Sequence, residues 1–160
     1  MTTTIRDAHP DDLPAILQMV RDLAAFERMA DQVVFDGAEF GRHVFGPDPV
    51  VTVDIAEVDG EVAGMALWFR SFSTFLGKPG IWLEDLFVDP DARGSGLGRA
   101  LLSRLAGLVV ERGGARLEWA VLDWNELGKG FYRSIGAGPV DGWERWRMEI
   151  GAIEVLARGV

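Results

Sequence analysis

The sequence predicts a single α/β domain, residues 1–160, built around one mixed β-sheet. Helical and strand-like patterns alternate along the chain without repeats or low-complexity linkers. Asp59-Gly60 separates two strand-like runs and is a strong signal for a tight antiparallel hairpin. Farther along, a strand, a helix and another strand follow one another, which predicts a parallel pair. Together, the two kinds of pairing predict a mixed sheet flanked by helices.

The first half of the chain supplies three strands and two helices. Residues 3–7 read as a short strand, and apolar residues at helical spacing follow from Leu13 to about Glu27. A shorter helix is expected over 37–45, ended by a Gly-Pro pair. The hairpin strands are expected at 50–57 and 61–69.

The second half continues the alternation after an unusually apolar loop. The segment SFSTFLGKPG, residues 71–80, is expected to tuck under the fold or to contact a ligand. The elements predicted after it are a fourth strand ending near Val88, a helix over 97–112, a fifth strand over 116–122, a helix over 125–134 and a Trp-rich strand over 143–150.

Composition narrows the class of protein. The chain is 48% hydrophobic, yet its uncharged apolar runs are roughly four to eight residues long, shorter than a membrane span. It contains no cysteine, which excludes disulfides, thiolate nucleophiles and cysteine metal sites. We also expect no signal peptide. These features suit a cytoplasmic enzyme.

The net charge of −9 favours cationic partners. An acidic chain repels nucleic acid and anionic lipid, so we expect neither as a partner, and it attracts amines. The charge by itself is equally compatible with acids that only keep the protein soluble.

A glycine-rich loop after the fourth strand predicts an anion site. Arg93-Gly94-Ser95-Gly96-Leu97-Gly98 opens a helix, whose first amides have no partners within the helix. Arg93 and Arg99 add positive charge, so a phosphate or pyrophosphate fits better than a simple tight turn. The nucleoside-triphosphate motif is absent, and Leu101 stands where a dinucleotide motif needs glycine, which makes dinucleotide binding the weaker interpretation.

The remaining pattern, Arg-x-x-Gly-x-Gly, resembles the acetyl-coenzyme A (acetyl-CoA) loop of the GNAT superfamily of N-acetyltransferases. The resemblance covers nearly the whole chain and is closest to the branch of diamine (spermidine/spermine) and thialysine N-ε-acetyltransferases. Its most specific segments are LAAFERMADQV (23–33), FSTFLGKPGIWLEDLFV (72–88), AVLDWNE (120–126) and GFYRSIGA (130–137). VLDWN looks closer to the thialysine type.

This resemblance implies a twisted mixed sheet whose fourth and fifth strands splay apart, with acetyl-CoA between them. It also implies a homodimer. The cofactor-binding residues implied are Leu86, Phe87, Val88, Arg93, Gly94, Ser95, Gly96, Leu97, Gly98, Arg99, Asn125, Glu126, Leu127 and Gly128. The family usually has proline soon after the asparagine, where this chain has Leu127-Gly128.

Two residues match the catalytic positions of the family. Glu84 matches the strand acid that binds the amine and takes its proton, and Tyr132, the only tyrosine, matches the acid that protonates the departing thiolate. Glu84 and Asp85 would face opposite sides of a regular strand unless a bulge intervenes. The absence of cysteine and of a serine elbow favours direct attack by the amine over an acyl-enzyme, and no residue pattern predicts a metal.

The resemblance also implies an acidic, aromatic pocket for a small cationic amine, with Trp119 as a cation–π face. The residues in this set are Phe26, Glu27, Glu84, Asp85, Glu118, Trp119, Ala120 and Asp141.

Three functions remain open from the sequence. The first is acetylation of a small diamine, polyamine or lysine analogue, and the second is acetylation of protein lysines or N-termini. The apolar loop 71–80 suggests a closed site and favours the first. The third, an inactive coenzyme A-binding module, is disfavoured because Glu84 and Tyr132 are both present.

Overall fold

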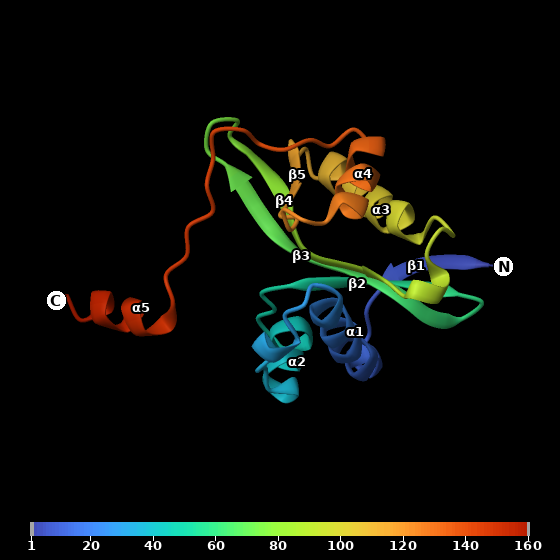
Figure 1. Cartoon of the computed structure of the whole chain (residues 1–160), viewed down its shortest axis with the longest axis horizontal. Helices are drawn as coiled ribbons and strands as arrows, with labels where there is room; N and C mark the ends of the chain where they lie inside the picture. The colour runs from blue at the N-terminus through green and yellow to red at the C-terminus, as the bar shows by residue number, and fades with distance from the viewer. Residues whose placement is uncertain (1, 160) are drawn as a thin grey trace. The chain divides into compact units, whose positions relative to one another are not determined.

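The computed structural model describes residues 2–159. The chain divides into two compact units, one ending at Trp124 and the other starting at Asn125. The first unit holds a five-stranded sheet in the order β1-β2-β3-β4-β5 (Figure 1). Every neighbouring pair is antiparallel except β4 and β5, which are parallel. The predicted mixed sheet is therefore confirmed.

The elements of the first unit follow the sequence pattern closely. Its strands are β1 (Thr3–Asp7), β2 (Thr52–Val58), β3 (Glu61–Ser73), β4 (Lys78–Val88) and β5 (Arg116–Trp119), and its α-helices are α1 (Leu13–Phe26), α2 (Gly37–Phe45) and α3 (Leu97–Glu111). Asp59 and Gly60 both have positive φ, at 51° and 88°, as a tight two-residue hairpin turn requires.

The prediction of a loop over residues 71–80 is wrong. The strands β3 and β4 continue through most of it and pair from Ser73 with Lys78 onward, leaving a short turn. Phe72 and Phe75 are 64% and 90% exposed, so the apolar residues of this hairpin do not tuck under the fold. Alternating small and aromatic residues suit a strand as well as a loop, and pairing between neighbouring strands decides between them.

The pairing between β4 and β5 is short. It runs from Gly80 with Arg116 to Leu83 with Trp119, and β4 continues to Val88 without β5 beside it. At Gly80 a β-carbon would lie 2.8 Å from the carbonyl oxygen of Arg116, so glycine permits the close approach of the two strands. Beyond Leu83, β4 has no strand on its β5 side, because β5 ends at Trp119.

Helices cover both faces of the sheet (Figure 1). On one face, α1 and α2 pack on a buried cluster made of Ile16, Met19, Val44, Val53, Ile55, Met65, Leu67 and Phe87. On the other face, α3 buries Leu97, Leu101, Leu102 and Leu105. Arg104 of α3 binds Asp54, which places Asp54 on the α3 face and the adjacent Ile55 on the α1 face.

The second unit contains α4 (Glu126–Ser134) and α5 (Ile150–Ala157). The predicted strand over 143–150 is wrong, because residues 143–149 are irregular and a helix starts at Ile150. Trp143 and Trp146 are 76% and 87% exposed. Aromatic residues favour strands only where another strand offers backbone groups to pair with, and the described part of this unit has none.

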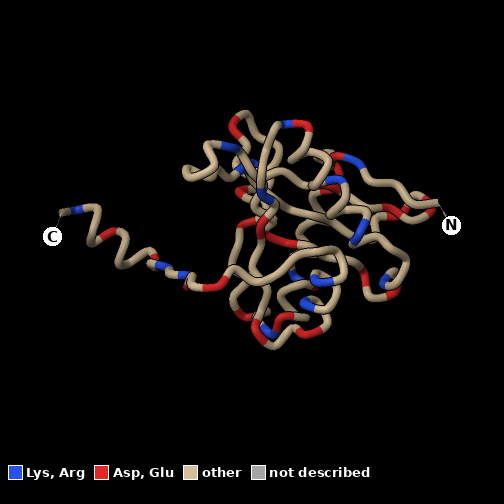
Figure 2. The backbone as a smooth tube through the Cα atoms, turned by 90° about the horizontal axis from the view of Figure 1, so that it is seen from above, with Lys and Arg blue, Asp and Glu red and all other residues tan. Residues whose placement is uncertain are grey.

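The described residues contain neither a membrane-spanning helix nor a metal-binding cluster. Between residues 2 and 159, no helix combines the length and apolar character needed to cross a membrane, and no group of His, Cys, Asp and Glu is arranged to hold a metal ion. Figure 2 shows basic positions interspersed with acidic ones along the first unit, without a continuous basic stripe.

Candidate active site

A β-bulge lies in β4 at Glu84. Asp85 pairs with Leu67 of β3 and Leu83 pairs with the next residue, Trp68, so Glu84 is left without a partner on β3. A bulge breaks the alternation of side chains and re-aims the residues around it. The sequence did not decide whether a bulge interrupts the strand at the acidic pair, and the structure shows that one does.

The bulge turns both acids toward α1. Asp85 shares the face of Leu67, which packs against α1. Glu84 accepts a hydrogen bond of 2.8 Å from the indole Nε1 of Trp82, which lies on the same face two residues earlier. Glu84 is exposed and Asp85 is half-buried.

A third carboxylate reaches this region from the end of α1. Burial, followed by the negative charges of Glu84 and Glu27, raises the pKa of Asp85 to about 6. Burial also raises the pKa of Glu27. We call Glu27, Glu84 and Asp85 the acid cluster. Carboxylates held together and partly removed from water gain from a bound cation, which relieves both repulsion and desolvation.

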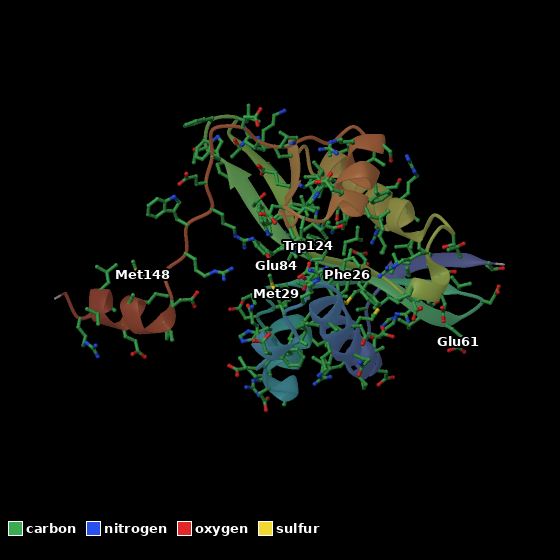
Figure 3. The ribbon with its side chains drawn as sticks, viewed as in Figure 1. Phe26, Met29, Glu61, Glu84, Trp124 and Met148 are labelled. Carbon is green, nitrogen blue, oxygen red and sulfur yellow. The ribbon has the colours of Figure 1, made fainter. Side chains whose placement is uncertain are left out.

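Two aromatic rings border the acid cluster. Phe26 is the last residue of α1 and precedes Glu27, and its ring centroid lies 6.1 Å from that of Trp124 at a tilt of 48° (Figure 3). We call Phe26 and Trp124 the aromatic pair. The guanidinium carbon of Arg93 lies 5.1 Å from the Phe26 ring centroid, and Arg93 Nε donates to the carbonyl oxygen of Val88. Arg93 thus links the glycine loop to the acid cluster region.

The glycine loop has the backbone that an anion site needs. Gly94 and Gly96 adopt positive φ values of 80° and 91°, and a β-carbon on either would meet no protein atom within 4 Å. Gly96 is the N-cap of α3, and the first helical bond runs from the Ala100 amide to its carbonyl. The amides of Leu97, Gly98 and Arg99 precede that bond and are available to a ligand. Ser95 uses its hydroxyl to donate to Ala92.

The predicted cofactor strand follows the bulge. Leu86, Phe87 and Val88 pair with β3 on one side and extend past the last pair with β5 on the other. Phe87 is buried in the core on the α1 face, while Leu86 pairs with Ala66 and so faces α3. The side chains of these residues serve packing, so any cofactor contact would be made by the backbone.

Three predicted substrate residues lie at the end of β5, and the register of β5 with β4 places two of them on opposite faces of the sheet. Glu118 pairs with Trp82 and shares its face, which is that of the acid cluster. Trp119 pairs with Leu83 and lies on the α3 face, opposite the acid cluster. Ala120, just after the strand, is exposed. On the acid-cluster face, the cation–π contacts are made by Phe26 and Trp124 instead.

The second unit carries the other predicted residues. Asn125 caps α4 by accepting from the Gly128 amide at 2.9 Å, and a β-carbon on Gly128 would collide with the Asn125 amide group. Glu126 pairs with Lys129, and Leu127 is exposed. Tyr132 is half-buried, with its ring 5.4 Å from that of Phe131. Asp141 is exposed beside a turn at Gly142.

Comparison with known proteins identifies the family. Residues 16–137, most of the chain, match the acetyltransferase (GNAT) family. The chain belongs to this family. It is accordingly an acyltransferase, and members of the GNAT family use acetyl-CoA as the acetyl donor.

Similar proteins support the same branch of the family. The chain is 34% identical to a thialysine N-epsilon-acetyltransferase of Bos taurus, with 96% of each chain covered. It is 27% identical to an L-ornithine N5-acetyltransferase of Arabidopsis thaliana, covering 98% of this chain and 88% of that one. Among solved structures, an integron cassette protein from the mobile metagenome of V. cholerae aligns with a TM-score of 0.82 at 25% identity over 99% of each chain.

Sequence reasoning missed two residues of this region. Trp124 is part of the VLDWN segment, but nothing in its spacing predicts a stack on Phe26. Arg28 follows Glu27 and places its guanidinium carbon 4.9 Å from the Trp124 ring centroid. A cation next to an acidic residue usually indicates a solvent-exposed pair, so the sequence offered no signal for this stack.

Proposed function

We propose that this GNAT enzyme transfers the acetyl group of acetyl-CoA to a primary amine of a small diamine, polyamine or lysine analogue. The observation that carries the proposal is the acid cluster, in which the β4 bulge turns Glu84 and Asp85 toward α1 just past the last pair with β5. The names of the thialysine and ornithine relatives support an amine at the end of a short chain.

The glycine loop is the part of the chain that fits acetyl-CoA. Its open left-handed backbone, free first-turn amides and two arginines suit the pyrophosphate, and the unpaired side of β4 suits the pantetheine arm. When bound, acetyl-CoA supplies the acetyl group as a thioester. Asn125 and the start of α4 complete the proposed cofactor contacts.

The acid cluster prepares the amine for attack. An ammonium bound between carboxylates must lose a proton before it can attack, and Asp85, whose pKa is raised to about 6, is ionised at neutral pH and can accept it. Glu84, which matches the family's strand acid, binds the amine and can also take its proton, directly or through water. Tyr132 returns a proton to the thiolate of the leaving group, as its match to the family motif implies.

Protein lysine acetylation is the second candidate function. The exposed side chains of Phe72 and Phe75 favour it, because the hairpin that carries them does not close a pocket in the first unit. A peptide lysine and a free lysine analogue present the same terminal amine. The homodimer and the cytoplasmic location remain parts of the proposal that rest on the resemblance and on composition.

Two measurements on the purified protein test the proposed function. Acetyl-CoA should raise the melting temperature, because a ligand that binds only the folded state stabilises it, whereas acetate should not. Thiol release should then be seen with diamines, polyamines or lysine analogues and should exceed that with lysine peptides. Tyr132→Phe should lower turnover ~10²–10⁴-fold while keeping the acetyl-CoA shift.

Each failure has a distinct meaning. No acetyl-CoA binding at millimolar concentration would overturn the interpretation of the glycine loop. Binding without turnover on any amine would favour the inactive module, and turnover on peptides alone would favour the protein acetyltransferase.

A further inference from the structure

Arg28 occupies a backbone position that an arginine rarely takes. It lies just beyond α1 with a φ of +63°, in the left-handed region. Its amide donates to the carbonyl of Ala25, and the Met29 amide donates to that of Ala24, which is the hydrogen-bond pattern of a Schellman motif. Glycine is the usual residue there because it has no β-carbon. An arginine at this point carries conformational strain, which raises the question of what its side chain does.

The side chain of Arg28 rests on the aromatic pair. Its guanidinium carbon lies 4.9 Å from the centroid of Trp124, whose ring contacts Phe26. Arg28 is exposed, and none of the ion pairs within residues 2–159 includes it, although it directly follows Glu27 of the acid cluster. An exposed guanidinium over a ring has N–H groups along its edge, and that edge fits a carboxylate with two parallel hydrogen bonds.

The charges around this edge distinguish two kinds of amine. The acid cluster attracts every cationic amine, whether or not the substrate carries another group. The Arg28 guanidinium, which directly follows Glu27 in the chain and lies over Trp124, repels the far ammonium of a plain diamine. It attracts the carboxylate of an amino acid whose side chain ends in an amine.

We propose that Arg28 binds the α-carboxylate of an amino-acid substrate and makes this enzyme selective for ω-amino amino acids over the corresponding diamines. In this arrangement the acid cluster takes the amino groups, and Arg28 takes the carboxylate at the exposed end. The inference rests on the proposed function and names the substrate class of that same site.

The test compares substrates that differ only in the carboxylate. Lysine is paired with 1,5-diaminopentane and ornithine with 1,4-diaminobutane, and the measured quantity is the ratio of kcat/KM for each amino acid to that for its diamine. The parent enzyme should favour the amino acid. Arg28→Gln should lower this ratio ~10–100-fold, the range expected for loss of a hydrogen-bonded charged partner, with most of the change in KM.

The chain offers a matched control on α1, the helix that Arg28 follows. Arg21 of α1 also stacks on an aromatic ring, with its guanidinium carbon 5.0 Å from the Phe35 centroid. Arg21→Gln removes the same charge and the same kind of stack and should leave the ratio unchanged. Arg28→Lys keeps the charge but not the planar fork, so its ratio should fall between those of the parent and Arg28→Gln.

Four outcomes would overturn the inference. An unchanged ratio in Arg28→Gln, or a parent enzyme that does not discriminate, would refute it while the acetyltransferase proposal stands. A lost acetyl-CoA melting shift in Arg28→Gln would assign Arg28 to the cofactor phosphates instead. If the folded parent acetylates none of the four amines and only peptides, the small-amine proposal fails as well.

Discussion

At the scale of single residues, Asp85 shows how the site is maintained at the expense of stability. Its carboxylate is half-buried, close to Glu84 and Glu27, and makes no ion pair within the described residues. A carboxylate in such surroundings holds its proton more tightly than in water. The same surroundings bind a cationic amine well, so the cost to the empty protein and the benefit to the substrate have one cause.

Replacement of Asp85 by asparagine should therefore stabilise the fold in a pH-dependent manner. Because the pKa is raised to about 6 in the folded state, against about 4 in an unfolded chain, ionised Asp85 destabilises the protein above pH 6. This penalty shrinks as the pH falls from 6 to 4 and disappears below 4, where both states are protonated. At pH 7.5, Asp85→Asn should raise the free energy of unfolding by ~1–3 kcal/mol, and the gain should shrink over that window.

Urea unfolding at a series of pH values measures this difference. The exposed Asp48 is the control, since Asp48→Asn should show no such trend. An Asp85→Asn variant less stable than the parent at pH 7.5 would contradict the account of a destabilising carboxylate.

At the scale of elements, α3 joins a buried apolar stripe to an N-terminus left open for a ligand. Leu97 is 1% exposed and anchors the first turn, while the preceding residues 93–96 are exposed. Gly96 is in the left-handed region at the N-cap and has no side chain to accept from the free amides. A helix start that is firmly packed but uncapped is suited to an anion.

Substitution of Gly96 should separate backbone strain from ligand binding. Gly96→Ala should lower the free energy of unfolding by ~1–2 kcal/mol, because alanine is strained at a φ of 91°. Gly96→Asn should lower it less, since asparagine tolerates this region and can cap the helix. Both variants should reduce the melting shift produced by acetyl-CoA, because the side chain fills the open space beside the amides.

Gly113, at the other end of α3, provides the matched control. It also has positive φ, at 64°, and open space around its α-carbon. Gly113→Asn should keep the full acetyl-CoA shift in a melting experiment. A full shift in Gly96→Asn as well would show that the loop does not hold the cofactor.

At the scale of the first unit as a whole, Arg104 ties α3 to the distant N-terminal strands. It donates to Asp54 of β2 at 3.3 Å and to Asp7 of β1 at 2.9 Å. Asp54 is only 1% exposed and also accepts from the Trp68 indole at 2.6 Å. A buried carboxylate depends on such hydrogen-bond partners, because burial removes the water molecules that would otherwise bind it.

A double-mutant cycle should measure how much the contact between Arg104 and Asp54 contributes to the free energy of unfolding. Arg104→Met should lower the free energy of unfolding by ~1–3 kcal/mol, since Asp54 stays buried with one donor fewer. Asp54→Asn combined with Arg104→Met should lose less than the sum of the two single variants, because no unpaired charge remains. Additive losses in urea unfolding would show that the two residues do not act together.

Much of the fold was predictable because local patterns and tertiary pairing agree. The helix at 37–45 is matched residue for residue by α2, since Asp36 caps it and Gly46 ends it. The Asp59-Gly60 hairpin formed as predicted for the same reason. The predictions for residues 71–80 and 143–150 were wrong, because a strand forms only where a neighbouring strand supplies backbone hydrogen bonds. Pairing made the first segment mostly strand and left the second without a described partner.

The sequence by itself determined the family, the mixed sheet and the position of the anion loop, because these depend on short motifs and on the spacing of apolar residues. Only the tertiary structure decided how the acids are used. The pairing of β3 with β4 creates the bulge that turns Glu84 and Asp85 to one face, and the end of α1 adds Glu27. It also decided that Arg28 stacks on Trp124, which lies 96 positions farther along the chain (124 less 28). Contacts of this kind follow from where whole elements pack, and no local pattern encodes them.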